Sequence, residues 1–121
     1  MATWSDDDLE RIGRAGEWRV AGRRQDGTLR KLVIIWGVRV GDSLYVRSVN
    51  GPDAGWFRGT QVLGDGQIEV DGVPYEVSFV PDAERSDEID DAYRRKYGTG
   101  SSVRAINATK AAATTLRVDP R

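Results

Sequence analysis

The feature that most constrains the fold is a change in hydrophobic period near residue 17. From there to residue 80, apolar and polar residues alternate in short segments, as in strands with one buried face. Turn sequences such as Gly41-Asp42 and Asp71-Gly72 separate them and favour hairpins. The alternating segments cover residues 17–22, 32–40, 43–49, 67–70 and 73–80. Short strands joined by Gly-rich turns predict an antiparallel barrel or sandwich rather than a parallel sheet.

The segment 32–40 is the most apolar of these strands. Ile34 and Trp36 fall on one face, while Val33 and Ile35 make the other face apolar as well. We therefore expect a continuous strand that is buried on both sides for part of its length, with Trp36 in the core. Truncating such a tryptophan to alanine would cost ~3–5 kcal/mol.

Two helices flank the predicted strands. Ser5 followed by three aspartates is a capped helix start, which predicts a short helix over residues 6–14. Apolar residues recur at helical spacing over residues 86–97. One face of that helix holds Ile89, Ala92, Tyr93, Lys96 and Tyr97. We expect residues 98–102 to be a flexible loop and 114–118 to be a strand that closes the barrel as an edge.

Composition favours one domain over residues 1–121. The chain is 39% hydrophobic and 31% charged, and no apolar run approaches the ~20 residues that span a bilayer. An acidic N-terminus without a signal-like apolar stretch predicts a cytoplasmic protein that does not bind membranes. Eighteen Lys and Arg against nineteen Asp and Glu leave a net charge of −1, which argues against nucleic-acid binding.

The sequence contains neither cysteine nor histidine. Their absence excludes Ser-His-Asp triads, Cys-His dyads and the usual zinc sites, so we predict no metal site. Chemistry at this protein would depend on a bound coenzyme or on carboxylates and tyrosines.

Aromatic and arginine residues gather around a Gly-rich loop near residue 50. Aromatic planes can stack a conjugated ring, while guanidinium and backbone N–H groups can hold phosphate. A planar anionic small molecule is therefore the predicted ligand. The candidate binding residues are Arg23, Arg24, Trp36, Arg47, Ser48, Asn50, Gly51, Trp56, Phe57 and Arg58. We expect Arg47→Ala and Arg58→Ala to weaken binding and to leave the fold intact.

Several of these motifs resemble known families. The run Leu44-Tyr45-Val46-Arg47-Ser48, the triplet Trp56-Phe57-Arg58 and the segments 91–98 and 113–117 resemble a bacterial domain family of unknown function. Residues 22–58 are also similar in order to the deazaflavin-dependent nitroreductases and the pyridoxamine-phosphate-oxidase-like proteins. Both resemblances imply a split β-barrel of the FMN-binding kind, mainly β with flanking helices.

The resemblance also implies a function. Its members suggest an oxidoreductase that acts on a small organic molecule and holds FMN or an 8-hydroxy-5-deazaflavin coenzyme in a groove between the barrels of a homodimer. By this resemblance the coenzyme phosphate would contact the first turn and the loop before the aromatic pair. The corresponding residues are Arg23, Arg24, Ser48, Asn50, Gly51, Trp56 and Phe57. Tyr45 or Tyr97 could then donate a proton to a substrate.

Two alternatives remain open at this point. A barrel without coenzyme could bind or transform a small apolar molecule by non-redox chemistry, with Asp53, Asp91, Tyr45 or Tyr97 as acids and bases. A barrel without any chemistry could serve as an interaction module. Binding of a flavin or deazaflavin would separate the first hypothesis from both.

Overall fold

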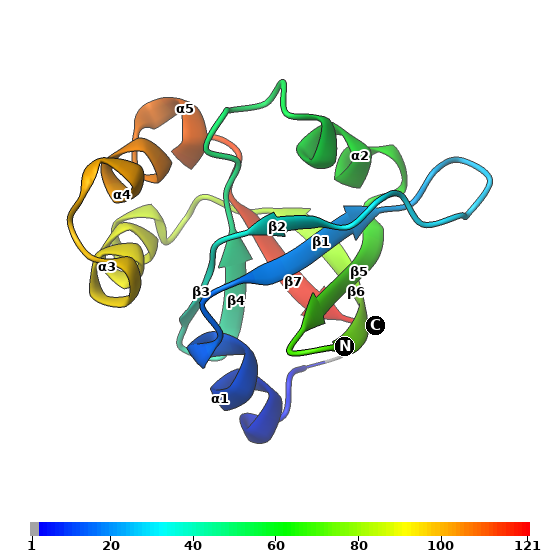
Figure 1. The fold of residues 1–121 in the computed structure, drawn as a ribbon, viewed down its shortest axis with the longest axis horizontal. Coiled ribbons are helices and arrows are strands. Elements are labelled where there is room, and N and C mark those ends of the chain that lie inside the picture. The colour runs from blue at the N-terminus through cyan, green and yellow to red at the C-terminus, as the bar shows by residue number, and fades with distance from the viewer. Residues whose placement is uncertain (1–2) are drawn as a thin grey trace.

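A computed structural model describes residues 3–121, which form one sheet of seven antiparallel strands curved into a nearly closed barrel (Figure 1). The sheet order is β2-β1-β5-β6-β7-β4-β3. Its strands are β1 (Trp18–Gly22), β2 (Val33–Ile35), β3 (Gly37–Val40), β4 (Ser43–Val46), β5 (Asp65–Val70), β6 (Val73–Pro81) and β7 (Leu116–Pro120). Helices pack around the outside. The architecture confirms the predicted split-barrel class.

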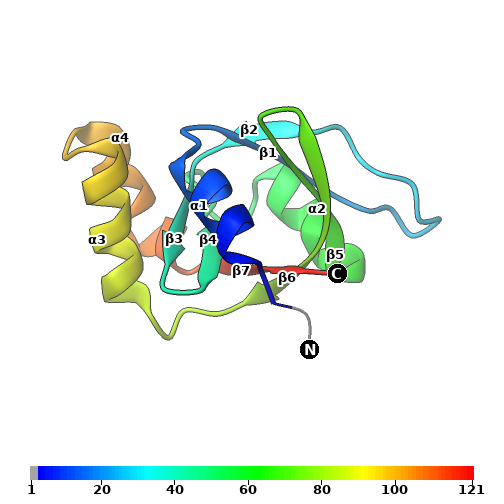
Figure 2. The same cartoon turned by 90° about the horizontal axis from the view of Figure 1, so that it is seen from below.

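Both predicted helices are present. Helix α1 (Asp6–Arg14) begins where the Ser5 hydroxyl accepts a hydrogen bond from the Asp8 N–H at 3.1 Å, and α3 (Ser86–Tyr97) has its predicted bounds. Three further helices were not predicted. These are α2 (Gly55–Leu63), α4 (Ser101–Ile106) and α5 (Thr109–Ala112). Figure 2 shows α3 and α4 beside one another at one end of the barrel.

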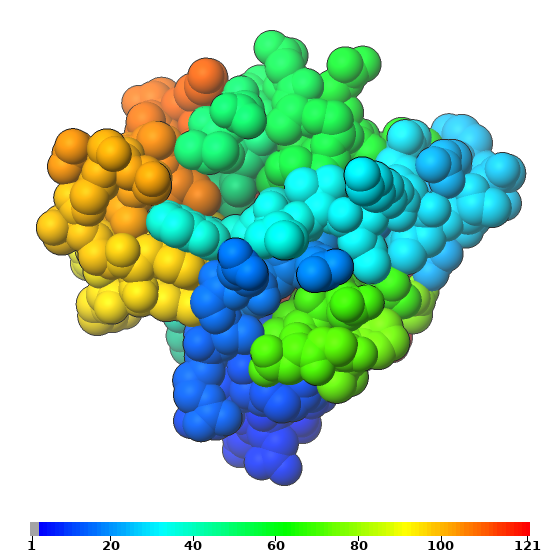
Figure 3. All heavy atoms as spheres, in the orientation of Figure 1, coloured from blue at the N-terminus to red at the C-terminus, as the bar shows by residue number. Residues whose placement is uncertain are grey.

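The two edge strands of the sheet are consecutive in the chain. Strand β2 ends at Ile35 and β3 begins at Gly37, so Trp36 alone links the two edges. The predicted continuous strand over 32–40 is therefore wrong. Val33 and Ile34 keep 38% and 52% of their surface exposed instead of entering the core, because β2 lies at the surface (Figure 3).

Side chains of α3 bond to the main chain where it passes from β2 to β3 at Trp36 and Gly37, a point that we call the crossing. The Tyr93 hydroxyl donates to the Trp36 carbonyl at 3.0 Å, and Lys96 Nζ donates to the Gly37 carbonyl at 2.7 Å. The Tyr97 hydroxyl accepts from the Gly37 N–H at 3.3 Å and lies 2.9 Å from the Gly16 carbonyl oxygen. Residues 93, 96 and 97 share one face because three and four positions make about one helical turn.

The barrel interior is filled by aliphatic side chains around one fully buried tryptophan. Trp18 Nε1 donates to the Ile12 carbonyl at 2.9 Å, which ties α1 to the barrel. Core residues include Leu9, Ile12, Val20, Leu44, Ile68, Val77, Leu116 and Val118. A second apolar cluster lies between the barrel and the helices α3 and α4. It contains Val38, Tyr45, Ile89, Tyr93, Val103 and Ile106.

The C-terminal strand differs from its prediction. Strand β7 covers residues 116–120 and pairs with β4 on one side and β6 on the other, so it is central and not an edge. The hairpin of β5 and β6 is as predicted, with Asp71 and Gly72 both at positive φ in the turn. No helix of residues 3–121 is long and apolar enough to span a bilayer.

Gly37 provides a test of how closely the barrel packs at the crossing. A Cβ atom at Gly37 would lie 2.2 Å from the Trp18 ring, which is fully buried and cannot move aside freely. We predict that Gly37→Ala lowers the free energy of unfolding by ~1–3 kcal/mol through overpacking. Urea unfolding followed by tryptophan fluorescence measures the change.

Gly16→Ala is the matched control, because a Cβ atom at Gly16 would meet nothing within 4 Å. Its free energy of unfolding should stay within about 1 kcal/mol of the parent. Equal stability of the two variants would show that the ring of Trp18 does not pack against Gly37.

Candidate functional site

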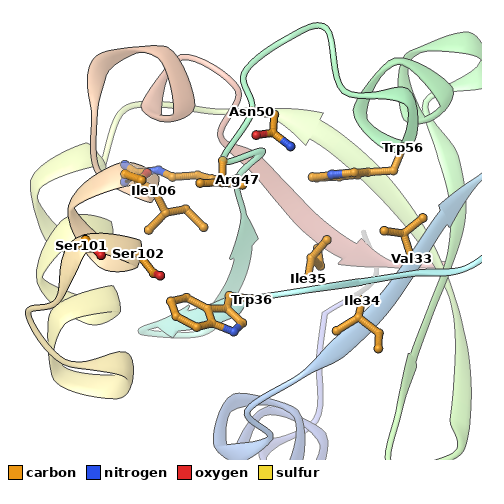
Figure 4. Close-up of a pocket in the computed structure, with 12 residues that line it drawn as sticks. Val33, Ile34, Ile35, Trp36, Arg47, Asn50, Trp56, Ser101, Ser102 and Ile106 are labelled. Carbon is orange, nitrogen blue, oxygen red and sulfur yellow. Dashed lines mark hydrogen bonds between the residues drawn. The ribbon is translucent and has the colours of Figure 1, made fainter.

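A cavity of about 580 Å³ opens beside the crossing (Figure 4). It lies between β2, the segment after β4, the start of α2 and helix α4. Its lining residues are Val33, Ile34, Ile35, Trp36, Arg47, Val49, Asn50, Trp56, Ser101, Ser102, Ala105 and Ile106. Most are apolar, and the polar side chains stand mainly at the rim.

Two tryptophans stand on opposite sides of this cavity. In Figure 4, Trp36 lies on the side of α4 and Trp56 on the side of α2, with Ile35 between them. The Trp36 ring stacks on Tyr97 with their centroids 4.2 Å apart and their planes 5° from parallel. This stacking fixes one aromatic wall. The arrangement can accept a flat conjugated molecule, because aromatic rings prefer offset stacking.

The position of Trp56 follows from close packing of α2 on β1. A Cβ atom at Gly22 would lie 2.3 Å from the Gly59 carbonyl oxygen, so only glycine at position 22 permits this approach. The loop before α2 is anchored as well. The Ser48 hydroxyl donates to the Gly51 carbonyl at 2.7 Å, and the Ser48 N–H donates to the Thr114 hydroxyl at 2.8 Å.

Arg47 is almost completely buried, at 1% exposure. Its guanidinium donates to Asp90 at 2.5 Å, to the Asn107 side chain at 3.0 Å and to the Ser86 hydroxyl at 3.1 Å, while Nε donates to the Thr115 hydroxyl at 2.9 Å. These bonds tie the end of β4 to α3 and to the chain before β7. Because this charge is buried and paired, we expect Arg47→Ala to destabilise the fold, in place of the sequence-based expectation that it leaves the fold intact.

The other predicted arginines lie away from the lining. Arg23 pairs with Glu76 and donates to the Gly27 carbonyl at 3.0 Å. Arg24 donates to the Leu29 carbonyl at 3.0 Å, within the same projecting loop. Arg58 is exposed on α2, two positions after the lining residue Trp56.

Most of the remaining candidate binding residues line the cavity or support the loop that borders it. Trp36, Arg47, Asn50 and Trp56 meet at the cavity, and Ser48 and Gly51 support its loop. Phe57 packs partly buried against the barrel core.

Neither predicted tyrosine is among the described residues that line the cavity. Tyr45 is buried in the cluster beneath α3. Tyr97 stands behind Trp36, and burial raises the pKa of its hydroxyl to about 12, which makes it a weaker proton donor than a free tyrosine. Asp53 is exposed in the loop before α2, and Asp91 is exposed and bonded to Arg94 at 2.7 Å.

The wall contributed by α4 was missed. Ser101, Ser102, Ala105 and Ile106 lie in or just after a stretch whose glycines and serines predict a flexible loop. The spacing of Val103 and Ile106 was the available signal, because both are buried on one face of a single helical turn. Residues 3–121 contain no group of three or more His, Cys, Asp or Glu side chains that could hold a metal ion.

The nearly closed barrel with a cavity at its seam has the split-barrel fold. Residues 8–118 match the family described as "Uncharacterized protein conserved in bacteria (DUF2255)", and the chain belongs to this family. No curated protein matches it.

Solved structures with the same fold include three that span nearly all of this chain. An F420 reductase superimposes with a TM-score of 0.62 at 17% identity, covering 98% of this chain and 96% of its own. Campylobacter jejuni ChuZ gives a TM-score of 0.65 at 16% identity over 93% of this chain and 50% of its own. A putative 5-nitroimidazole antibiotic resistance protein from Bacteroides thetaiotaomicron gives 0.58 at 17% identity, covering 99% and 81%. Likeness at this identity shows the fold alone.

A pair of arginine variants tests the structural role of Arg47. We predict that Arg47→Met lowers the free energy of unfolding by ~3 kcal/mol or more, because Asp90 and its neighbours lose their buried partner. Arg58→Met should change it by less than ~0.5 kcal/mol, because that side chain is exposed. Urea unfolding of both variants at one pH measures the difference, and a similar small effect of the two would show that Arg47 is not structural.

Proposed function

We propose that the protein binds FMN or a deazaflavin coenzyme with its tricyclic ring in the cavity between Trp36 and Trp56. The observation that carries the proposal is an apolar cavity of about 580 Å³ with two tryptophan walls at the seam of a split barrel. Cavities of roughly 300–1,000 Å³ hold drug-sized ligands. The name of the similar F420 reductase supports the choice of coenzyme class.

The lining fits the ring of such a coenzyme. Ile34 and Ile35 offer an apolar surface, and the two indoles offer planes on which a conjugated ring can stack. At the rim, the Asn50 amide and the hydroxyls of Ser101 and Ser102 can bond to ring carbonyl and nitrogen atoms.

Of the four predicted arginines, Arg58 is the one left to hold the phosphate. Arg47 is occupied by Asp90, while Arg23 and Arg24 are bonded within or beside their own loop. Among residues 3–121, Arg58 and Lys110 have no hydrogen bond or ion pair from their side chains. The Lys110 stem lies over Gly51, since a Cβ atom there would meet its Cγ at 2.5 Å. We assign the phosphate to these two exposed cations, because Arg58 follows the lining residue Trp56 by two positions and Lys110 lies over Gly51, next to the lining residue Asn50.

A bound coenzyme of this class supplies hydride transfer. The chain would orient the ring between its tryptophans, hold the phosphate and keep water from the apolar floor. The absence of histidine and cysteine is compatible with this activity, because the coenzyme and not a side chain would transfer the hydride. The proposed activity is accordingly an oxidoreductase that acts on a small organic molecule.

One observation favours a second candidate function, which is binding of an apolar molecule without coenzyme. Arg47, the charged residue of the lining, is neutralised by Asp90, so the wall offers little attraction to an anion. Under this alternative an uncharged aromatic compound would bind and coenzymes would not.

Thermal shift with FMN, F420 and an uncharged aromatic compound separates the two functions. A ligand at 100 times its Kd adds about 2.7 kcal/mol of stability, so a coenzyme that binds should raise Tm clearly. We predict that Trp56→Ala weakens coenzyme binding about tenfold through lost stacking. Arg24→Gln is the control and should bind as the parent does. Binding of the uncharged compound alone would contradict the coenzyme proposal.

We also propose that the protein is a homodimer whose second copy covers the open side of this cavity. Val33, Ile34 and Val49 border the cavity and expose 38%, 52% and 44% of their surface. Apolar side chains gathered at one place mark contact surfaces. Because β2 bonds to β1 on one side only, its other edge is open to a partner.

Light scattering after size exclusion measures the oligomeric state. We predict a dimer for the parent chain and a monomer for Ile34→Lys, since a buried lysine would prevent contact. Val73→Lys is the control, because Val73 is 41% exposed at the tip of the β5–β6 hairpin. A parent chain of about 13.4 kDa at micromolar concentration would refute the dimer and leave the coenzyme proposal standing.

A further inference from the structure

A second cavity of about 290 Å³ lies between α1 and α3, with β3 as its floor. Its lining residues are Leu9, Glu10, Gly13, Arg14, Val38, Arg39, Ala92, Arg95 and Lys96. None of these described residues lines the first cavity, so the two are separate sites. The proposed coenzyme binding plays no part in the second.

The second cavity carries an excess of positive charge. Four basic side chains from three different elements face one carboxylate, that of Glu10. Glu10 lies 3.8 Å from Arg14 and 4.0 Å from Arg39, at the outer limit of an ion pair. Arg95 makes no side-chain hydrogen bond or ion pair within residues 3–121. A guanidinium group left free in this way can bind a small carboxylate or phosphate in its fork.

Lys96 also lines this cavity. Its Nζ donates to the Gly37 carbonyl at 2.7 Å and lies 5.1 Å from the centres of both the Trp18 and the Tyr97 rings. Burial lowers the pKa of this amine to about 8. At pH 7 about a tenth of it is neutral, roughly three-hundredfold more than for an ordinary lysine. A neutral, desolvated lysine is a nucleophile towards carbonyl carbons.

We propose that this cavity binds a small anionic carbonyl compound, an aldehyde or a 2-keto acid, and that Lys96 condenses with it to form an imine. The arginines hold the anionic group while the Nζ lone pair attacks the carbonyl carbon. The carbinolamine formed then loses water, so that one C=N bond replaces the C=O bond. No oxidant or reductant takes part. Hydrolysis returns the free amine, so the step is reversible.

Labelling at the lysines tests the proposal on the whole protein. The chain has three lysines, and Lys31 and Lys110 are exposed, so they serve as internal references. Glyoxylate with cyanoborohydride converts any imine to a stable secondary amine, which peptide mass spectrometry locates. At pH 7 we expect modification of Lys96 at least about tenfold faster than of either reference lysine.

The anion dependence is tested with an uncharged aldehyde and with two arginine variants. Propionaldehyde should show a smaller preference for Lys96, because it gains nothing from the arginines. Arg95→Gln should slow glyoxylate labelling of Lys96 about tenfold, the loss expected for one charge-assisted contact, and leave propionaldehyde labelling unchanged. Arg94→Gln, on the same helix and outside the lining, should match the parent with both reagents.

The pH dependence adds a further check. Labelling of Lys96 should rise up to about pH 8 and then level, whereas the reference lysines continue to rise towards pH 10. The charged and titratable groups that line the cavity with Lys96 are Glu10 and Arg14 of α1, Arg39 of β3 and Arg95 of α3, and the Tyr97 ring lies 5.1 Å from the Lys96 Nζ. Equal labelling of all three lysines, or an Arg95→Gln variant that labels like the parent, would overturn the proposal.

Discussion

The structure depends on the hydrogen bonds that side chains of α3 make to the main chain at Trp36 and Gly37. The chain passes there from one edge of the sheet to the other, and β2 and β3 do not pair with one another in the seven-stranded sheet of residues 3–121. Without strand pairing, the backbone groups at the seam need other partners, because an unbonded buried carbonyl is costly. Tyr93, Lys96 and Tyr97 supply them. The barrel is therefore closed at this seam by side chains of α3, which lies outside the sheet, and not by strand pairing.

This manner of closure explains where the cavities lie. The unpaired seam leaves room between β2 and α4, and Trp36 stands at its border because it is the linking residue. On the far side of the same crossing, α3 and α1 flank β3 and leave the cationic cavity. Helix α3 faces both, with Tyr97 behind one wall and Lys96 in the other. Neutralisation of Arg47 makes the first cavity apolar, whereas an excess of basic side chains over the single carboxylate of Glu10 makes the second attractive to anions.

The candidate site was partly predictable from sequence. Trp36, Asn50 and Trp56 were identified by residue type near a Gly-rich loop, and all three line the cavity. The roles of the arginines were not predictable. Arg47 is structural because Asp90 and Asn107, more than forty residues away, surround it in space. A sequence shows that an arginine is present, but its partners decide whether its charge is available to a ligand.

Sequence alone was enough to determine the elements whose signals act within a few residues, namely helix caps, helical periodicity and turn glycines. These elements are the capped helix of residues 6–14, the amphipathic helix of 86–97 and the hairpin around Asp71-Gly72. The tertiary structure alone decided the break at Trp36. Segment 33–40 has the pattern of one strand, and it divides because its two halves find partners at opposite edges, β1 and β4. The central place of β7 was decided in the same way, since β4 and β6 bond to it on both sides. Pairing between distant segments cannot be read from the local alternation of apolar and polar residues, because an edge strand and a central strand both alternate with a period of two.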